Sequence, residues 1–449
     1  MEEINLIAIE KHSEKLRKNL EILPLNKLEE DFAMGNYGWT RDLILSIYYE
    51  ASTGKIPRNL EYRIGNRGDG FDSLDFDYKY DFDEKDFLRC FDDIDISLDL
   101  NKRNYGEKIK ISMPMYGAGM SFGSISLNVM LARAMAAKEL NTFTSTGEGG
   151  YPRELMKYKE HVITQISTGY FGVREETILI TRIVEFKYAQ GAKPGLGGHL
   201  LAPKVTPEVA KMRETVPFVN IYQPFPFHSV YSVEDHKKHV DWIRTVNPDA
   251  LVSVKVSTPI DVDMVAVGIY YAGAHIIHLD GGYGGTGASP EFAKKNIAMP
   301  IEFAIPKVHK YLVQEGVRDN IVLMVSGGIR TPHDVAKAIA LGADGCIIGS
   351  AELIALGCTQ CGNCEKGGGG KGCQIGIATS NRRLSLLQDP KWGCKRLINM
   401  YKAWCYELKK ILYMLGLKRI AELRGRYDLL IDYGPKFKGY EEYLDYLKK

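Results

Sequence analysis

The sequence has little of what marks secreted, membrane-spanning or nucleic-acid-binding chains. It holds 8 cysteines in 449 residues, which is too few for a disulfide-stapled scaffold. Lys and Arg total 58 against 56 Asp and Glu, so the net charge of +2 leaves no basic footprint for nucleic acid or a membrane surface. No apolar run approaches the ~18 residues of a spanning helix, and the first residues lack the basic-then-apolar order of a signal peptide. We therefore expect a soluble, cytoplasmic protein that binds neither nucleic acid nor membrane.

The order of the predicted elements indicates the fold class. From residue 109 onward, short β-branched runs alternate with amphipathic helical segments. This pattern favours a parallel α/β sheet, and eight such units close into a (β/α)8 TIM barrel. Seven strands are predicted at Ile109–Met113, Ile183–Lys187, Val219–Ile221, Leu251–Val256, His275–Leu279, Ile321–Val325 and Gly345–Ile348, and an eighth near Thr142–Ser145.

The chain is predicted to divide into three parts. Residues 1–105 form a helical or irregular N-terminal extension, with helices at Glu10–Leu23 and Trp39–Ala51. Its acidic, aromatic-rich stretch at residues 69–99 packs onto the main domain or, alternatively, docks a partner. Residues 106–390 form the barrel and include a cysteine-rich loop at 356–379. Residues 391–449 form a C-terminal helical tail.

Glycine is abundant, at 45 residues, and it clusters after the last two predicted strands. These strands lead into Gly327 and Gly328 and into Gly349 and Ser350. Phosphate sites of (β/α)8 barrels use the loops after strands seven and eight, where glycine amides and a helix N-terminus donate N–H groups. We interpret the paired loops as a phosphate site. The alternative is that the glycines only form tight turns between strand and helix.

A second glycine-rich segment spans Asp280–Ser289 and includes Gly284 and Gly285. Backbone without side chains at the carboxyl end of a barrel strand lets a flat ligand approach the main chain. The alternative is a flexible lid.

Two lysines lie at or near the ends of predicted strands, Lys187 and Lys255. A buried lysine is costly unless it faces an anion, so we predict that both ammonium groups face one. The alternative is a pair of surface lysines.

Four cysteines fall within residues 358–373: Cys358, Cys361, Cys364 and Cys373. Thiolates three residues apart can reach one compact cluster, which favours iron–sulfur ligation. Zinc is the competing metal.

Seven segments match one known family, in order, over roughly residues 105–430. They are Gly117–Ser126, Ser145–Gly150, Gln165–Val173, Glu185–Gly195, Gly284–Pro290, the cysteine-rich loop ending at Thr379, and Leu417–Leu430. Together they resemble the FMN-binding synthase domain of glutamate synthases, in a stand-alone form similar to the archaeal type.

The resemblance implies a cofactor and a reaction. The enzyme would hold FMN and reduce the 2-iminoglutarate formed from 2-oxoglutarate and ammonia, with hydride from the flavin and electrons supplied through an iron–sulfur cluster. It implies cofactor contacts at Ser121, Lys187, Lys255, Gly284, Gly285, Gly327, Gly328, Gly349 and Ser350. It implies catalytic roles for Lys187, Gln190, Lys193 and Glu148, and substrate binding by Lys193, Gln190, Arg213 and Glu148. Arg213 and Lys193 would supply the cations that a dicarboxylate needs.

The chain departs from the family at its N-terminus. It begins Met1-Glu2, without the N-terminal cysteine of an amidotransferase domain, so we expect ammonia from solution or from a separate amidotransferase subunit. It also lacks the cysteine runs of a ferredoxin-like domain. We therefore expect an electron-donor protein, either a ferredoxin or a reductase subunit.

Two further departures concern the cluster and the substrate. Cys358, Cys364 and Cys373 match in order the three ligands of a [3Fe-4S] cluster, and Cys361 is an additional candidate ligand that permits a [4Fe-4S] cluster. Leu196 and His199 replace an acidic residue and a glutamine of bacterial enzymes, which leaves the substrate's identity open.

Two alternative functions fit the same scaffold. One is the synthase-like subunit of methylamine–glutamate N-methyltransferase, which exchanges one amine for another on a glutamate skeleton. The other is a flavin and iron–sulfur electron-transfer subunit without substrate chemistry. Net turnover of 2-oxoglutarate would exclude the electron-transfer subunit, and dependence on methylamine would favour the methyltransferase.

Overall fold

The computed structural model describes residues 38–434 except 68, 196, 286–288, 290–292, 294–295, 366 and 371, together with Glu14 and Gly35. The predicted helix at Glu10–Leu23 and the substituted position Leu196 lie outside the described residues. Within the described part of the chain, no helix is long and apolar enough to cross a membrane.

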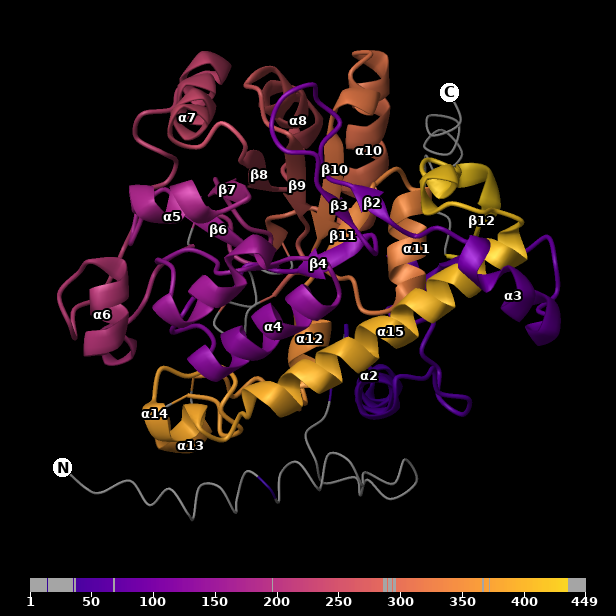
Figure 1. Ribbon diagram of the computed structural model, residues 1–449, viewed down its shortest axis with the longest axis horizontal. Coiled ribbons are helices and arrows are strands. Elements are labelled where there is room, and N and C mark those ends of the chain that lie inside the picture. The colour runs from indigo at the N-terminus through magenta and orange to yellow at the C-terminus, as the bar shows by residue number, and fades with distance from the viewer. Residues whose placement is uncertain are drawn as a thin grey trace.

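Eight parallel strands form the central sheet, in the order β4-β11-β10-β9-β8-β7-β6-β5. They are β4 (Met115–Gly117), β5 (Thr144–Ser145), β6 (Val162–Ser167), β7 (Ile183–Lys187), β8 (Leu251–Ser257), β9 (Ile276–Asp280), β10 (Val322–Ser326) and β11 (Gly345–Ile348). The edge strands β4 and β5 meet through a parallel backbone bridge between Gly119 and Ser145. The sheet is therefore a nearly closed barrel, which confirms the predicted fold class (Figure 1).

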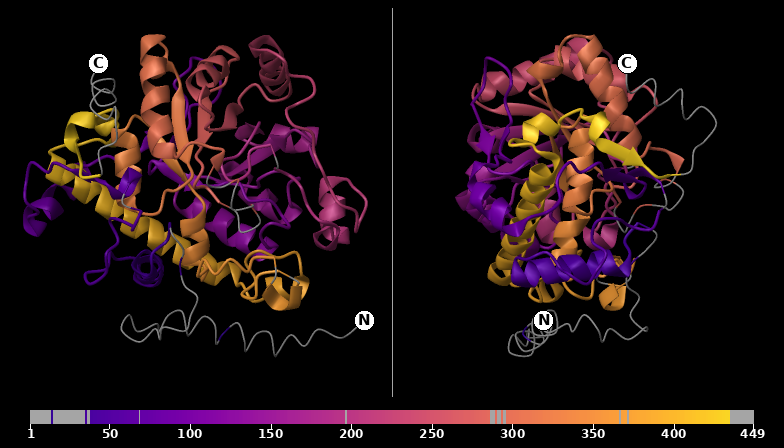
Figure 2. Two further views of the ribbon diagram at one scale, coloured as in Figure 1. Left: turned by 180° about the vertical axis from the view of Figure 1, so that it is seen from behind. Right: turned by 90° about the vertical axis from the view of Figure 1, so that its right-hand side faces the viewer.

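Helices alternate with these strands and lie outside them, as the views in Figures 1 and 2 show. They are α4 (Leu127–Glu139), α5 (Glu175–Ile180), α6 (Pro207–Arg213), α7 (Val233–Val246), α8 (Val262–Tyr271), α10 (Ile301–Gln314), α11 (Pro332–Ala340) and α12 (Ser350–Ala355), with a 3-10 segment at Arg153–His161 after β5. Local sequence fixes several helix starts. The hydroxyl groups of Thr206, Ser232 and Thr331 accept backbone N–H groups of the first turns of α6, α7 and α11.

Two of the predicted barrel strands are wrong. Within Ile109–Met113 only β3 (Lys110–Ile111) is a strand, and it pairs antiparallel with β2 (Leu98–Asp99) outside the barrel. Within Val219–Ile221 the backbone forms a single antiparallel bridge, between Ile221 and Leu200. The barrel instead uses β4 and β6.

Side chains inside the barrel change from apolar to charged along the strand direction. The amino-terminal end of the barrel interior holds one apolar cluster, and residues of and next to the paired strands β2 and β3 contribute to that cluster. Its members are Leu98, Leu100, Ile109, Ile111, Tyr116, Phe143, Ile163, Ile183, Leu251, Ile276, Val322, Met324 and Ile347. Because successive side chains of a strand alternate between faces, the next inward positions along β7 after Ile183 are Glu185 and Lys187. The carboxyl end of the barrel is therefore polar.

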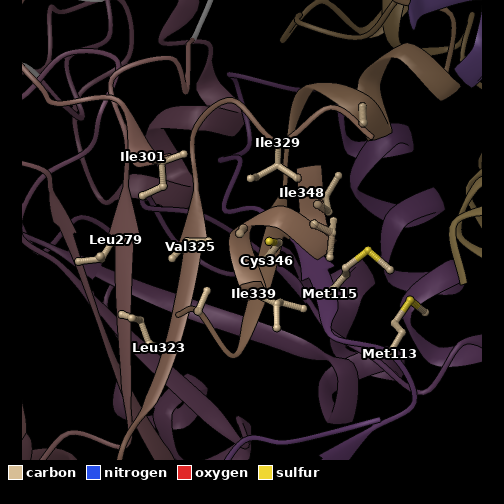
Figure 3. Close-up of a cluster of buried hydrophobic side chains, with 14 of the residues drawn as sticks. Met113, Met115, Leu279, Ile301, Leu323, Val325, Ile329, Ile339, Cys346 and Ile348 are labelled. Carbon is tan, nitrogen blue, oxygen red and sulfur yellow. The ribbon is translucent and has the colours of Figure 1, made fainter. Parts of the chain in front are cut away.

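The outward faces of the strands build the main core. Figure 3 shows Leu279, Leu323 and Val325 from β9 and β10 in the same apolar cluster as Cys346 and Ile348 from β11. Ile301 of α10 and Ile339 of α11 belong to the same cluster. The exclusion of these side chains from water holds the helices onto the barrel.

The N-terminal segment and the tail share this core. Helix α15 (Pro390–Leu415) packs against α4, α11, α12 and α2 (Arg41–Thr53). Trp404 of α15 donates its indole N–H to Glu50 of α2 at 2.8 Å. Strand β1 (Leu74–Phe76) pairs antiparallel with β12 (Leu430–Asp432).

The aromatic stretch at residues 69–99 packs in part as expected. Phe71, Phe76 and Phe87 are buried, whereas Tyr80 and Phe82 are exposed. A short helix, α3 (Glu84–Cys90), carries Phe87, and the aromatic ring of Phe87 lies 5.5 Å from that of Tyr413 on α15.

Candidate active site

Charged side chains gather at the carboxyl-terminal end of the barrel. Lys187 closes β7 and stands opposite Lys255 of β8, and Asp280 closes β9 opposite Ser326 of β10. All four are buried. The carboxyl ends of parallel strands meet at the same end of a barrel, which is where (β/α)8 enzymes carry out their chemistry.

Each lysine has an acidic partner. Lys187 Nζ lies 2.9 Å from Glu148 Oε1, and Lys255 Nζ lies 3.0 Å from Asp280 Oδ2. Glu148 comes from the loop after β5, which the glycines at 147, 149 and 150 shape with positive φ angles. Both lysines are thus buried and paired with carboxylates, and neither is a surface lysine.

These pairs shift the pKa values of their members. Burial alone would raise the pKa of Glu148, but the cations of Lys187 and Arg213 outweigh it and lower the pKa to about 2. Burial and the neighbouring Lys255 lower the pKa of Lys187, while Glu148 opposes them. For Lys255 burial works against the ammonium group, but Asp280 and Glu185 prevail and raise its pKa. At neutral pH Glu148 is therefore a carboxylate.

A hydrogen-bonded chain connects the second pair to the barrel interior. Asp280 Oδ1 accepts a 2.5 Å hydrogen bond from Ser326 Oγ, which lies 2.8 Å from His278 Nε2. His278 Nδ1 in turn lies 2.9 Å from Glu185 Oε2. The Glu185 carboxylate also accepts hydrogen bonds from Gln165 and Ser253. This network fixes the orientation of Asp280 and thereby of Lys255.

Arg213 lies at the end of α6, behind Glu148. Its Nη2 donates to Ser121 Oγ at 3.2 Å and its Nη1 donates to Gly198 O at 3.3 Å, while its buried Nε has no protein partner within the described residues. A Cβ on Gly149 would lie 2.8 Å from this Nε. The arginine thus keeps one buried donor directed at the glycine loop that carries Glu148.

Gln190 and Lys193 lie in the loop after β7. Gln190 is buried and Lys193 is half-buried. Burial and the cation of Lys187 lower the pKa of Lys193, and Glu148 and Glu365 oppose them. His199 lies farther along the same loop, where its ring packs edge-on against Tyr222. The structure therefore brings Lys193 into the electrostatic reach of Lys187 and Glu148.

The glycine segment after β9 has a structural use that the sequence interpretation did not anticipate. A Cβ on Gly281 would lie 2.6 Å from Ile301 Cβ, and one on Gly327 would lie 2.4 Å from Gly281 O. Gly281 and Gly327 are thus required for contact between neighbouring backbones. Gly284 is half-buried and Gly285 is exposed at the rim.

The predicted phosphate loops lie side by side because β10 pairs with β11. Gly327 and Gly328 have φ angles of +94° and +104°, which side chains rarely adopt. Gly349 precedes α12, and a Cβ there would meet only Ala118 Cβ, at 3.6 Å. Two buried lysines and this glycine cradle, open at Gly349, suit a flat cofactor with a phosphate tail.

The cysteine-rich loop lies between α12 and α15. Burial, with a further contribution from the thiols of Cys364, Cys373 and Cys361, raises the pKa of Cys358 to about 12, so these three thiols lie within electrostatic reach of Cys358. Cys358 O accepts a hydrogen bond from Tyr48 of α2. Among the described residues, however, no three metal-ligating side chains converge in an arrangement that would hold a metal ion. Four cysteine thiols are nevertheless the donor type that binds an iron–sulfur cluster.

Sequence reasoning missed Asp280, Glu185 and His278 as site residues. Asp280 was visible as the acid between a strand and a glycine cluster, whereas the inward positions of Glu185 and His278 depend on strand register.

A large groove of about 1580 Å³ lies elsewhere, between residues 54–63 and α15, and none of the predicted site residues lines it.

The fold and this site define a (β/α)8 barrel with buried ion pairs at the carboxyl ends of its strands. The chain is similar to flavocytochrome b2 in a variant with sulfite bound, with a TM-score of 0.52 and 15% identity over 98% of this chain and 97% of that chain. A variant with benzoylformate gives a TM-score of 0.51 and 16% identity, covering 94% of this chain and 91% of that chain. At such identity the likeness concerns the fold alone.

Sequence relatives define the family. The conserved region in glutamate synthase matches residues 73–418. Archaeal glutamate synthase (NADPH) of Methanocaldococcus jannaschii is 41% identical, over 76% of this chain and 66% of its own length. Archaeal-type glutamate synthase (NADPH) of Thermotoga maritima is 40% identical, over 73% of this chain and 64% of its own. The chain belongs to the glutamate synthase family, and it spans about two thirds of the length of these relatives.

Proposed function

We propose that the chain carries the synthase half-reaction of a glutamate synthase: 2-oxoglutarate and ammonia condense to 2-iminoglutarate, which is reduced to glutamate. The observation that carries this proposal is the buried Lys187–Glu148 pair, 2.9 Å long, beside the buried guanidinium of Arg213. Two cations and one carboxylate around one loop suit a dicarboxylate substrate that exchanges a carbonyl oxygen for nitrogen.

FMN is the proposed cofactor, and it supplies the hydride when bound. Its proposed contacts are those of the two glycine loops together with Ser121, Lys187 and Lys255. Lys255, held by Asp280 at 3.0 Å, would stabilise negative charge on the reduced flavin. Lys187, whose pKa burial lowers, would serve both the flavin and the substrate, because it ends β7 and pairs with Glu148 of the loop after β5.

The protein's own side chains bind and orient the substrate. Arg213 and Lys193 pair with the two carboxylates, because a guanidinium and an ammonium group both form charge-assisted hydrogen bonds with carboxylate oxygens. Gln190 donates to the same substrate from the loop after β7. These cations hold the C2 carbon toward the end of the barrel.

Lys187 and Glu148 handle protons and charge in the condensation. Ammonia adds to the C2 carbonyl and one of its protons moves to the oxygen. Lys187 donates the second proton, so the oxygen leaves as water, the protonated imine remains, and Lys187 regains its proton from solvent. Glu148 stays ionised because its pKa lies at about 2, so it stabilises the positive charge of the protonated imine. Hydride addition at C2 then completes glutamate.

An iron–sulfur cluster bound by the cysteine-rich loop is the proposed entry point for electrons. The chemistry of the donor set and its position between α12 and α15 support it. A separate donor protein, such as a ferredoxin or a reductase subunit, would deliver the electrons, and a separate amidotransferase subunit would be one source of ammonia. The relatives named above are NADPH-dependent by name, which makes NADPH the expected ultimate reductant.

The proposal is tested under anaerobic conditions. The holoprotein is reduced chemically, mixed with 2-oxoglutarate and ¹⁵N-labelled ammonium, and followed by flavin absorbance and by the mass of glutamate. Reoxidation with stoichiometric labelled glutamate is the expected result. Reoxidation only with methylamine would favour the N-methyltransferase subunit, and reoxidation by an electron acceptor but never by 2-oxoglutarate would favour the electron-transfer subunit.

A further inference from the structure

The N-terminal segment reaches the glycine loop after β10 through Arg67. The Cζ atom of Arg67 lies 3.8 Å from the centre of the Tyr283 ring, in the segment after β9. A Cβ on Gly328 would lie 3.3 Å from Tyr283 Cβ and 3.6 Å from Arg67 Nη1. The half-buried guanidinium group of Arg67 therefore lies beside the backbone of Gly328.

The glycine loops after β10 and β11 bring no available cation of their own. The residues proposed to contact the phosphate, at 327, 328, 349 and 350, are all uncharged. Arg330 follows them, but it is buried and its guanidinium is ion-paired with Asp72 at 2.5 Å and Asp334 at 3.0 Å. A phosphate monoester carries about two negative charges at neutral pH, more than backbone amides alone neutralise.

Asp72 holds the backbone that carries Arg67. Its carboxylate accepts the N–H of Gly65 at 2.6 Å and the N–H of Arg67 at 3.1 Å, while it pairs with Arg330. This acid thus fastens the turn at residues 65–67 to the start of α11, next to the glycine loop. The position of Arg67 beside Gly328 follows from this connection.

The surroundings also leave room for the guanidinium group. A Cβ on Gly38 would lie 2.6 Å from Arg67 Nη2, so the absence of a side chain at residue 38 lets the guanidinium group take this position. Burial and the neighbouring cation of Arg330 lower the pKa of Arg67, while the carboxylates of Glu302, Asp334 and Asp72 oppose them, and a phosphate beside it would further stabilise the charged form. The guanidinium fork suits a phosphate because it donates two parallel hydrogen bonds.

We propose that Arg67 binds the phosphate of the flavin, as a cation that the N-terminal segment contributes to the barrel's glycine loops. The inference rests on the proposed FMN function and extends it. If Arg67 binds the phosphate, the turn at residues 65–72 is part of the cofactor site and not only a segment that packs on the outside of the barrel.

Paired binding measurements test this inference. Flavin-free protein is titrated with FMN and with riboflavin, which lacks the phosphate, for the unaltered chain, Arg67→Ala and Arg67→Lys. Arg67→Ala should weaken FMN binding by about ten- to a hundredfold, the range of a charge-assisted hydrogen bond, and leave riboflavin binding unchanged. Arg67→Lys should lose less. Arg63→Ala is the matched control, because Arg63 lies in the same segment with an exposed side chain paired to Glu61.

The outcomes separate the inference from the function beneath it. Equal FMN affinity in Arg67→Ala and the unaltered chain, or an equal loss for FMN and riboflavin, would overturn the role of Arg67 while FMN binding stands. Failure of the unaltered chain to bind FMN would overturn the proposed function as well. Far-ultraviolet circular dichroism and thermal unfolding of each flavin-free variant establish that the comparison is made on folded protein.

Discussion

Arg133 and Glu352 form a buried ion pair, 2.7 Å between Nε and Oε2, at the seam where the barrel closes. Arg133 extends from α4 and donates to the carbonyl oxygens of Ala118, after β4, and Ser145, at the end of β5. Glu352 of α12 also accepts a hydrogen bond from Tyr401 of α15 at 2.9 Å. The guanidinium group of Arg133 thus connects the ends of the edge strands β4 and β5, which otherwise meet through the single backbone bridge between Gly119 and Ser145.

Replacing Arg133 should open this seam. Arg133→Met leaves the Glu352 carboxylate buried without its cation, and the expected loss is about 3–5 kcal/mol in the free energy of unfolding. Denaturant unfolding measures this loss. Lys237→Ala removes an exposed ion pair with Asp241 and should change stability by less than about 1 kcal/mol. A similar, small effect of both substitutions would contradict the role of the seam.

The acid sensitivity of the fold should depend on Glu148 and Lys187. The pKa of Glu148 is about 2 in the folded chain against an ordinary 4.5, so its carboxylate stabilises the fold above about pH 4.5. That stability is lost as the pH falls from about 4.5 toward 2. Glu185 and Asp280, whose pKa values are also about 2, add to the same loss. Unfolding followed by denaturant at a series of pH values measures it.

A double-mutant cycle separates the pair from its neighbours. Lys187→Met alone should lose about 3–5 kcal/mol at pH 7, because it leaves Glu148 buried without its main cation. Lys187→Met combined with Glu148→Gln should recover much of that loss and should give a shallower dependence on pH between 4.5 and 2. An unchanged slope in the double variant would assign the acid sensitivity to Glu185 and Asp280 instead.

The sequence predicted the barrel because most of its strands are apolar runs followed by turns. The two strands that were not predicted, β4 and β6, are those in which this pattern is weak. Strand β6 was missed because the polar Gln165, which bonds Glu185 inside the barrel, interrupts its apolar run. Strand β4 has only three residues and lies next to the stronger β-branched run at Ile109, which instead fills the barrel from below. Which residues are apolar was readable from the sequence, but which face of the barrel they cover was not.

The sequence indicated most of the candidate site residues but not how they pair. Lys187 and Lys255 were identified because a lysine at the end of a buried strand needs an anion, and Glu148 was identified through the family resemblance. Asp280, which ends β9, was missed, and only the strand order brings the two acids to within 3.0 Å of the lysines. Arg67 comes from a segment outside the barrel, and no local pattern distinguishes it from a solvated arginine.

Arg213 should act on substrate affinity. Arg213→Lys keeps the charge but loses the guanidinium fork, so the KM for 2-oxoglutarate should rise by about ten- to a hundredfold, with a smaller change in kcat. Lys193→Ala should have a similar effect through the second carboxylate. Lys211→Ala, an exposed position on the same helix, is the control for Arg213 and should leave both constants unchanged. Normal 2-oxoglutarate affinity in Lys193→Ala would exclude Lys193 from the substrate site.

The iron content should depend on the cysteine-rich loop and on no other cysteine. Cys358→Ser, Cys364→Ser and Cys373→Ser should each lose iron and the corresponding electron paramagnetic resonance signal, because serine is a much poorer ligand for the cluster than thiolate. Cys394→Ala removes a buried cysteine on α15 and should keep both. Cys361→Ser then decides the cluster type: an unchanged iron content and signal indicate the three-cysteine [3Fe-4S] form, and loss of iron indicates a [4Fe-4S] cluster. Retention of full iron in Cys358→Ser would contradict ligation by this loop.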